Sequence, residues 1–359
     1  MAKQKDKNRG ETNLTATTNN GSMVNVNNGT INYISGNAEY SPVIDSMKDS
    51  LSKLEFKLSL NEQAIQRTNT FIGKILSLVS NRLKPEELQK LFEDPSFLID
   101  FTEAGKSYIK YGTAELLDVL SKIINERINE TQYSLLQIAI SETIKTAPLL
   151  LKEQMNTLAL AFVLMHTINL NVNSLATLKK YLKEIIIPIF NNGVSEKQSE
   201  FQHLSYARCA TISAFIKPLT SIFEDKYTGL FSNGFSESDI PIINGKRLSD
   251  LHHNLFIKCL NDNTKYQINA VNSKQLKDKI VSINEKDKKE IEKLFNKNKM
   301  NETSIKLKII EICPEMEKII DYWDNNTISH LTLSSVGIII GAITSSNITN
   351  NQYDLKIWI

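Results

Sequence analysis

The sequence contains few of the features that usually reveal what a protein does. It has three cysteines without a C-x-x-C pair, and no cysteine–histidine set has the spacing of a zinc site. A disulfide framework and a local metal site are therefore unsupported, and we expect reduced thiols, no metal and no cofactor. The 42 basic and 40 acidic residues nearly balance, which argues against attraction of the whole chain to nucleic acid or to an anionic membrane.

Long hydrophobic runs are missing as well. The strongest, residues 158–165 (LALAFVLM), reaches roughly half the length that a membrane-spanning helix needs. The run from Val336 to Ile343 (VGIIIGAI) is equally short, and its small residues favour a buried helix or strand. The first residues are polar and lack the apolar segment of a secretory signal peptide. We therefore expect a cytoplasmic protein without a transmembrane segment.

The familiar catalytic and nucleotide-binding motifs are also absent. There is no G-x-x-x-x-G-K-[ST], G-x-G-x-x-G, G-x-S-x-G or H-E-x-x-H sequence. The nearest match, Gly105-Lys106-Ser107, lies within a predicted amphipathic helix, where a phosphate-binding loop cannot form. The lysines of residues 284–299 are interleaved with acidic residues, a pattern typical of a solvated helix face. The sequence thus gives no catalytic residue and no strong nucleic-acid signal.

What the sequence does contain begins with a polar segment rich in Asn, Thr and Gly, residues 1–40. Within it, residues 23–34 (MVNVNNGTINYI) alternate between apolar and polar positions on both sides of an Asn-Gly pair. Because Asn-Gly favours the type I′ turn of a two-residue loop, this segment predicts a hairpin. The candidate pairing residues are Val24, Val26, Asn28, Gly29, Ile31 and Tyr33.

An isolated two-stranded hairpin is only marginally stable in water. In the isolated monomer we therefore expect a flexible Asn-rich tail. The hairpin would gain stability by pairing with a copy of itself or with the edge strand of another protein. Both interpretations of the tail stay open at this point.

Residues 41–231 have the 3.6-residue hydrophobic period of helices. The pairs Asp94-Pro95 and Gly112-Thr113 are typical of helix boundaries, with Asp94 and Thr113 as predicted N-caps. Residues 149–168 are apolar on nearly every side, which places this helix at the centre of a bundle. These features predict a helical core with short connections.

Beyond residue 231 the pattern becomes mixed. Residues 240–245 (IPIING) predict a strand edge and a turn, and residues 266–270 predict a short strand. Residues 284–299 predict a charged helix, and the alternating residues 353–359 (YDLKIWI) predict a final strand. We therefore expect a mostly α protein: a multi-helix bundle, a smaller C-terminal α+β portion at 232–359, and the flexible Asn-rich N-terminal tail.

Four residues form a weaker alternative site within residues 203–272. His203 and Cys209 are close enough in sequence to suggest a thiol–imidazole pair, although the apolar neighbours of Cys209 favour a buried thiol. His252 and His253 lie in a turn-rich segment, but adjacent side chains point to different sides and cannot chelate one metal locally. Because loops on a rigid scaffold often carry sites, an enzyme with an unrecognised site here remains an alternative.

Several short segments resemble a known family by their order along the chain. They are Asp94-Pro95-Ser96-Phe97, Leu135-Leu136-Gln137-Ile138, Thr146-Ala147-Pro148, Leu230-Phe231-Ser232-Asn233-Gly234-Phe235 and residues 333–341. They are similar to an uncharacterised bacterial family of mostly helical proteins, catalogued under the labels LPO and Vpar, over roughly residues 90–359. These motifs are packing and capping patterns, and the family has no established activity, so the resemblance implies no catalytic residues. The Asn-rich tail also resembles tails of bacterial conflict and phage-defence proteins.

Three functional hypotheses follow, in order of support. The first is a non-enzymatic interaction or oligomerisation protein, with a protein partner or further copies of itself, in a bacterial conflict or phage-defence system. The second is an enzyme or effector with an unrecognised site in residues 203–272. The third is a membrane-perturbing effector that uses the run from Val336 to Ile343.

Overall fold

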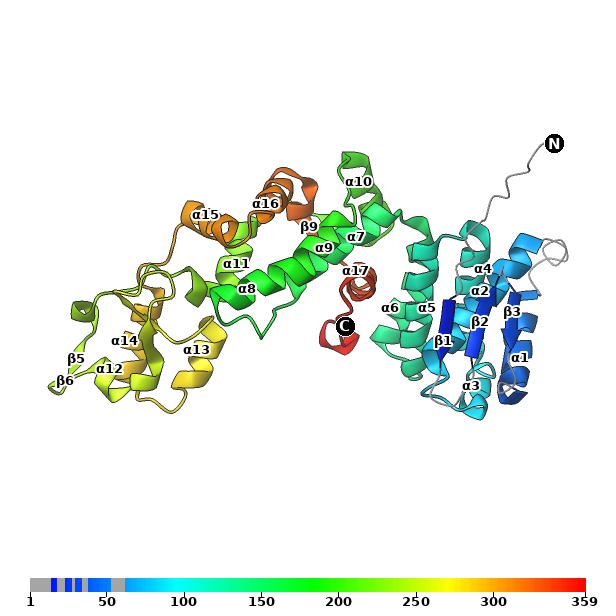
Figure 1. Ribbon diagram of the computed structural model, residues 1–359, viewed down its shortest axis with the longest axis horizontal. Coiled ribbons are helices and arrows are strands. Elements are labelled where there is room, and N and C mark those ends of the chain that lie inside the picture. The colour runs from blue at the N-terminus through cyan, green and yellow to red at the C-terminus, as the bar shows by residue number, and fades with distance from the viewer. Residues whose placement is uncertain (1–13, 18–22, 28–29, 34–37, 53–61) are drawn as a thin grey trace, which may run out of the picture. The chain divides into compact units, whose positions relative to one another are not determined.

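The structure, a computed structural model, describes residues 14–17, 23–27, 30–33, 38–52 and 62–359. As the sequence predicts, the described chain is mostly α-helical (Figure 1). Its packing separates two compact units. The first comprises the described part of residues 1–151 with residues 335–343 and 353–359, and the second comprises residues 152–334 and 344–352. This division differs from the composition-based segments 1–40, 41–231 and 232–359, because residues 152–231 pack with those that follow them.

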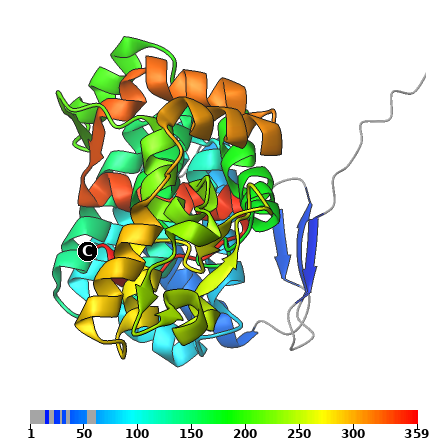
Figure 2. The same cartoon turned by 90° about the vertical axis from the view of Figure 1, so that its left-hand side faces the viewer.

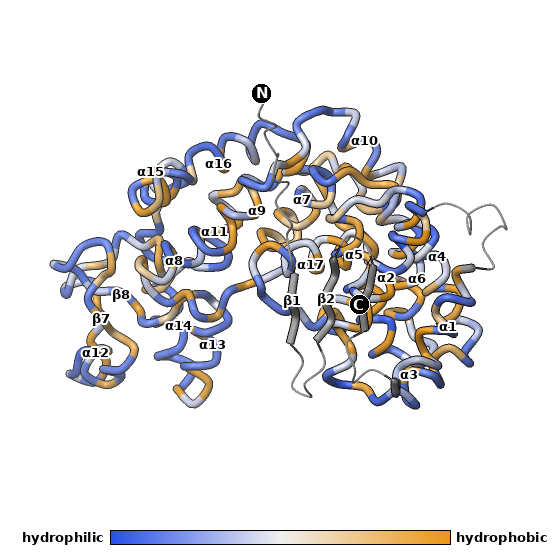
Figure 3. Tube along the Cα trace, turned by 45° about the vertical axis from the view of Figure 1, so that its right-hand side comes forward, coloured by the Kyte–Doolittle hydropathy of each residue, from blue (hydrophilic) through white to orange (hydrophobic). Residues whose placement is uncertain are grey.

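The first unit is a helical bundle preceded by three strands. Its helices up to residue 151, in chain order, are η1 (Ala38–Tyr40), α1 (Ser41–Ser52), α2 (Glu62–Val79), α3 (Pro85–Leu91), α4 (Pro95–Tyr111), α5 (Ala114–Asn129), α6 (Leu135–Thr146) and η3 (Ala147–Leu149). Hydrophobic residues concentrate along α2, α4 and α5 (Figure 3). Phe71, Phe97 and Phe101 are almost fully buried between these helices, so the aromatic residues form the centre of this core.

Helix boundaries in this unit follow the predicted capping residues. The Asp94 carboxylate accepts a hydrogen bond from the Ser96 backbone N at 2.9 Å, and Thr113 Oγ1 accepts one from the Leu116 backbone N at 3.3 Å. Each side chain satisfies an N–H group that the first helical turn leaves open. Gly112 ends α4 with a φ of 67°, a left-handed conformation that glycine adopts without strain.

Residues 105–107, the partial phosphate-loop match, lie inside α4 as expected. A Cβ atom added at Gly105 would collide with the side chain of Leu51 in α1. This glycine therefore allows α1 to pack closely against α4, and its role is one of packing.

A buried ion pair joins α4, α5 and α6. Arg127 Nε donates to Asp100 Oδ2 at 2.8 Å, and the other guanidinium nitrogens donate to Ser96 Oγ at 2.7 Å and the Glu130 carbonyl at 2.8 Å. Ser141 Oγ of α6 donates to the same Asp100 oxygen at 2.8 Å. Because both charges are paired and hydrogen-bonded, they can remain ionised in the interior.

The second unit is built around a continuous buried helix. α7 (Lys152–Ala161) continues as the π-helix η4 (Phe162–His166), and α7 is buried from Gln154 onward. The central position predicted for residues 149–168 is confirmed for residues 154–164. It is wrong at the ends, where Leu149, Leu151 and Ile168 are 53%, 57% and 42% exposed. α8 (Leu175–Tyr181), the π-helix η5 (Leu182–Ile186) and α9 (Ile187–Asn191) also follow one another without a break (Figure 1).

Other helices and a two-stranded sheet surround this centre. The helices are α10 (Gln198–Tyr206), α11 (Leu219–Tyr227), η6 (Thr228–Phe231), α15 (Glu302–Ile312), α16 (Met316–Asn325) and η9 (Thr327–His330). The strands are β4 (Ala210–Ile212) and β9 (Leu331–Leu333), which pair in antiparallel fashion with Thr211 opposite Thr332. This sheet connects residues that lie far apart in the chain.

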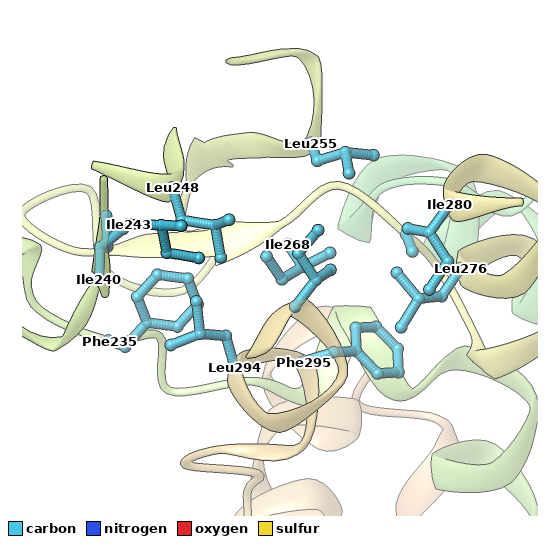
Figure 4. Packing of buried hydrophobic residues seen from close by; sticks show 12 residues of the cluster. Phe235, Ile240, Ile243, Leu248, Leu255, Ile268, Leu276, Ile280, Leu294 and Phe295 are labelled. Carbon is cyan, nitrogen blue, oxygen red and sulfur yellow. The ribbon is translucent and has the colours of Figure 1, made fainter. Parts of the chain in front are cut away.

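Residues between η6 and α15 form a small α+β portion with its own hydrophobic cluster (Figure 4). Its elements are η7 (Glu237–Asp239), β5 (Ile242–Ile243), β6 (Lys246–Arg247), α12 (Leu248–Leu251), η8 (His253–Leu255), β7 (Phe256–Lys258), β8 (Tyr266–Ile268), α13 (Ser273–Ile280) and α14 (Glu285–Asn296). The predicted turn, strand and charged helix are confirmed here. Asn244 and Gly245 both have positive φ, 52° and 78°, as a type I′ turn requires.

The C-terminal segment differs from the prediction. Residues 353–359 do not form the expected final strand, because Leu355–Ile357 is a 3₁₀-helix, η10, that begins with a hydrogen bond from Lys356 N to Asp354 Oδ1. Leu355 is buried, whereas Ile357 is 71% exposed. The apolar alternation therefore reflects one anchoring residue and a local turn, and the strand prediction is wrong.

The apolar run at residues 336–343 lies in α17 (Ser335–Thr349). Ile339 and Ile340 are fully buried, so this run is an interior helix, as its small residues favoured. Among the described residues, no helix combines the length and the hydrophobicity needed to cross a bilayer.

Candidate functional site

The N-terminal strands form an antiparallel sheet in the order β1 (Leu14–Thr17), β2 (Met23–Asn27), β3 (Thr30–Tyr33), labelled side by side in Figure 1 and turned by 90° in Figure 2. In the β2–β3 pair, Val24 lies opposite Tyr33 and Val26 lies opposite Ile31. Asn27 lies opposite Thr30, which leaves Asn28 and Gly29 between the strands; these two candidates lie outside the described residues. The third strand, β1, pairs Leu14 with Val26, and the sequence analysis did not anticipate it.

The outer strands of this sheet have a free edge. Within the part of the chain that the structure describes, β1 and β3 each pair only with β2. None of the three strand sequences (LTAT, MVNVN, TINY) contains a charged residue. Edge strands of stable monomers are usually protected by charges, prolines or bulges, because their open N–H and C=O groups otherwise recruit another strand. This edge therefore has the chemistry of a pairing surface.

The proposed partners His203 and Cys209 are held by different groups. His203 Nδ1 lies 3.0 Å from Gln154 Nε2 of α7. Cys209 is fully buried at the start of β4, and its Sγ donates to the Ala207 carbonyl at 3.6 Å. Burial raises the pKa of the Cys209 thiol to about 12. Because the thiolate is the reactive form, this cysteine is a packing residue.

The two adjacent histidines also have separate environments. His252 Nε2 lies 2.8 Å from Asp287 Oδ2, at the first turn of α14, whereas His253 is exposed in η8. The hydrogen bond from His252 lowers the pKa of the buried Asp287 carboxyl. This pair links α12 and α14 across the α+β portion. Among the described residues, no hydrogen bond joins either histidine to His203 or Cys209, so the structure does not bring the four candidates together.

A buried lysine is a feature that the sequence analysis missed. Lys226 of α11 points its Nζ at the carbonyls of Val163 and Leu164 in the π-helix η4, at 3.3 and 2.5 Å. No carboxylate of the described residues lies within ion-pair distance of it. Burial, with a smaller contribution from Lys217, lowers the pKa of Lys226 to about 7. Burial and the neighbouring Lys226 charge also lower the pKa of His166.

The Lys226 amine and the His166 side chain thus lie at the C-terminal end of the π-helix η4. Cations near a helix C-terminus interact favourably with its open carbonyls, and π-helical turns occur frequently at functional sites. The Tyr227 hydroxyl, next in the chain, accepts a hydrogen bond from the Asn169 backbone N at 3.0 Å. The sequence gave no signal for Lys226.

The surface depressions in the described part of the chain include two of several hundred cubic ångströms. One, about 490 Å³, lies between α1, α3 and α4, where Ser46, Gln89 and Ile99 are among its lining residues. The other, about 660 Å³, is a polar depression around Asn233, Asn261 and Lys265. Neither is lined by a histidine, and within the described ranges no group of histidine, cysteine or acidic residues could hold a metal ion.

Comparison with known proteins gives one match. A protein-family model, whose description ":-like" names no activity, matches residues 43–359. No curated protein and no solved structure matches the chain. The matched range covers the helical units and begins after β3, so the N-terminal sheet lies outside it.

Proposed function

We propose that this chain, which belongs to the uncharacterised bacterial family of mostly helical proteins that its sequence resembles, is a non-enzymatic interaction and oligomerisation protein. The observation that carries the proposal is the charge-free three-stranded sheet with open edges at β1 and β3. The histidine and cysteine candidates do not converge, which leaves this sheet as the best supported functional surface.

Main-chain pairing explains how such a surface would bind. An added strand satisfies the open N–H and C=O groups of an edge, and alternate side chains then select the partner. A sheet of few strands gains most from this addition, since few strands alone are marginally stable. The fitting partner is an extended, uncharged segment, and the β1 or β3 strand of a second copy is one that the chain itself provides.

We place this function in the cytoplasm, as part of a bacterial conflict or phage-defence system. The three cysteines are all free and buried, which suits a reducing compartment. The support for defence is the similarity of the Asn-rich tail to the tails of such proteins. A natural role for strand pairing there is assembly of several copies into an active complex.

The test is the molar mass of the full-length chain by light scattering. Replacing one residue on each outer strand with lysine, Thr15→Lys with Asn32→Lys, adds charges that oppose edge pairing. The matched control adds the same two charges at Asn19 and Asn20, between β1 and β2 in the sequence. We expect oligomers for the wild type and the control, and a smaller mass for the edge variant. A monomeric wild type, or an edge variant with unchanged mass, would contradict the proposal.

A further inference from the structure

The register of the N-terminal sheet sorts its residues onto two faces of different chemistry. Residues paired directly across antiparallel strands lie on the same face, and so do residues two apart along one strand. One face therefore carries the apolar or aromatic positions Leu14, Ala16, Val24, Val26, Ile31 and Tyr33. Apart from Met23, the other face carries only threonines and asparagines, such as Thr15, Asn25 and Asn32, which lie opposite one another across the strands. The sheet thus has an apolar face in addition to its open edges.

An apolar sheet face is stable when another surface covers it. Helix α2 runs close to β3 in the first unit. However, Phe71 of α2 packs against Phe101 and Tyr108 of α4, so the apolar side of α2 faces the helical core. The three strands contain no charged residue, so the same faces of two copies can meet without repulsion between like charges. A further copy of this chain is therefore the cover that fits the face best.

The area of the face decides how many copies are needed. The outer strands have four residues each. At about 3.4 Å per residue and about 4.8 Å between strands, the face measures roughly 14 by 14 Å, or about 200 Å². A specific protein interface buries about 800 Å² on each partner. Two single sheets stacked face to face therefore bury only about a quarter of the area that a stable dimer needs.

Edge pairing supplies the missing area. When β3 of one copy pairs with β1 of the next, an open edge remains at each end, so further copies can add. A register that places Ile31 and Tyr33 level with Leu14 and Ala16 of the next copy keeps the apolar positions on one side, because a slip of one residue would exchange the faces. Roughly four copies side by side then reach the area of a specific interface. Edge pairing and face packing therefore reinforce each other once several copies have joined.

We propose that the apolar faces of sheets from different copies pack against each other, so that the chain assembles in two layers about 10 Å apart, each extended by strand pairing at its edges. This inference rests on the proposed edge pairing and adds a second contact that edge pairing alone does not require. Assembly should be cooperative, because a layer of one or two copies is too small to hold the other layer. The partner is a further copy of this chain, contacted through Val24 and Val26 of the central strand β2.

The first experiment compares the two faces of β2 in the full-length chain. Val24→Thr with Val26→Thr keeps β-branched residues on the apolar face but adds two hydroxyl groups there. The matched control, Asn25→Thr with Asn27→Thr, introduces the same residue on the polar face. Sedimentation velocity at increasing concentration gives the concentration at which half of the protein is assembled. We expect the valine variant to raise this concentration about tenfold or more and the control not to raise it. An equal rise in both variants, or no rise in the valine variant, would overturn the proposal.

The second experiment identifies what covers the apolar face. The three native cysteines are free and buried, so a maleimide reagent reports the thiol added by Val24→Cys, or by Asn25→Cys on the polar face. We expect the thiol at position 24 to become protected as assembly proceeds, and the thiol at position 25 to stay reactive. Protection at position 24 already in the monomer would assign the face to the chain's own helices. Reactivity at position 24 in the assembled protein would show an open face, and either result overturns the proposal.

Failure of the layered packing can be distinguished from failure of the edge pairing. Thr15→Lys with Asn32→Lys places its charges on the outer strands at positions of the polar face, so it tests the edges and leaves the apolar face unchanged. If this edge variant has a smaller mass while the thiol of Val24→Cys stays reactive in the oligomer, edge pairing stands and the layered packing is wrong. A wild-type chain that is monomeric at every concentration contradicts both.

Discussion

At the scale of single residues, the structure gives ionisable side chains environments that the sequence did not indicate. Lys226 has no acidic partner among the described residues, and its amine lies against two backbone carbonyls beside His166. Folding desolvates this amine, so its pKa falls from 10.5 to about 7. The contact between α11 and the end of the central helix therefore depends on the protonation state of Lys226.

Lys226 should make stability depend on pH above neutrality. Between its folded pKa of about 7 and its unfolded pKa of 10.5, Lys226 is protonated more in the unfolded state than in the folded state. The free energy of unfolding therefore increases as pH rises through this range. Lys226→Met removes this gain. Wild-type stability should therefore rise relative to that of the variant between pH 7 and pH 10, measured as the urea midpoint. A constant difference between the two proteins would contradict the assignment.

Asp287 should also make stability rise with pH, but over a lower pH range. Its pKa is depressed by the hydrogen bond from His252, so its contribution is present above the ordinary carboxyl pKa and is lost as pH falls through the depressed value. Asp287→Asn should cost about 1 kcal/mol at neutral pH, the typical value of a hydrogen bond, and much less near pH 2. Asp278→Asn is the control and should show neither effect, because Asp278 is exposed on α13 and forms no ion pair with the residues that the structure describes.

At the scale of elements, local sequence signals predicted the start and end of helices well. Asp94 and Thr113 cap the helices they precede, and Asn244-Gly245 forms the expected turn, because these preferences depend on neighbouring residues alone. The π-helical segments η4 and η5, and the pairing of β4 with β9, had no such signal. They depend on contacts between residues far apart in the chain, which a single sequence does not reveal.

The C-terminal segment shows how a local pattern misleads. Its alternation suits a strand, but a strand needs a neighbour with open backbone groups, and Asp354 instead starts a 3₁₀ turn. In the candidate site, similarly, sequence spacing suggested that His203 pairs with Cys209. In the structure His203 instead lies within hydrogen-bond distance of Gln154, and the Cys209 thiol is buried. The β2–β3 register, by contrast, could be predicted because the Asn-Gly pair sets it locally.

The packing of α4, α5 and α6 against one another depends on the Arg127–Asp100 ion pair. Arg127→Met leaves a buried carboxylate without its partner and should cost about 3–5 kcal/mol. Replacing both members, Arg127→Met with Asp100→Leu, should recover much of this loss in chemical denaturation. Lys74→Met breaks an exposed pair with Asp118 and should cost less than about 1 kcal/mol. A small effect of Arg127→Met would show that the pair does not hold these helices.

At the scale of the whole molecule, the shared and the added parts of the chain support different conclusions. The net charge of +2 argues against attraction of the entire chain to anionic surfaces. The family match, in turn, covers both helical units and leaves out the N-terminal sheet. The proposed pairing function therefore belongs to a segment added to the shared family body.

The central claim is that the open edges of this sheet pair with another strand. Hydrogen exchange measured over a range of protein concentrations tests it most directly, because pairing protects edge amides only when copies associate. We predict that protection of residues 14–17 and 30–33 increases with concentration, while that of α13 on the surface of the second unit stays constant. Exchange of the two edge strands that does not change with concentration, in protein that light scattering shows to be oligomeric, would contradict the account.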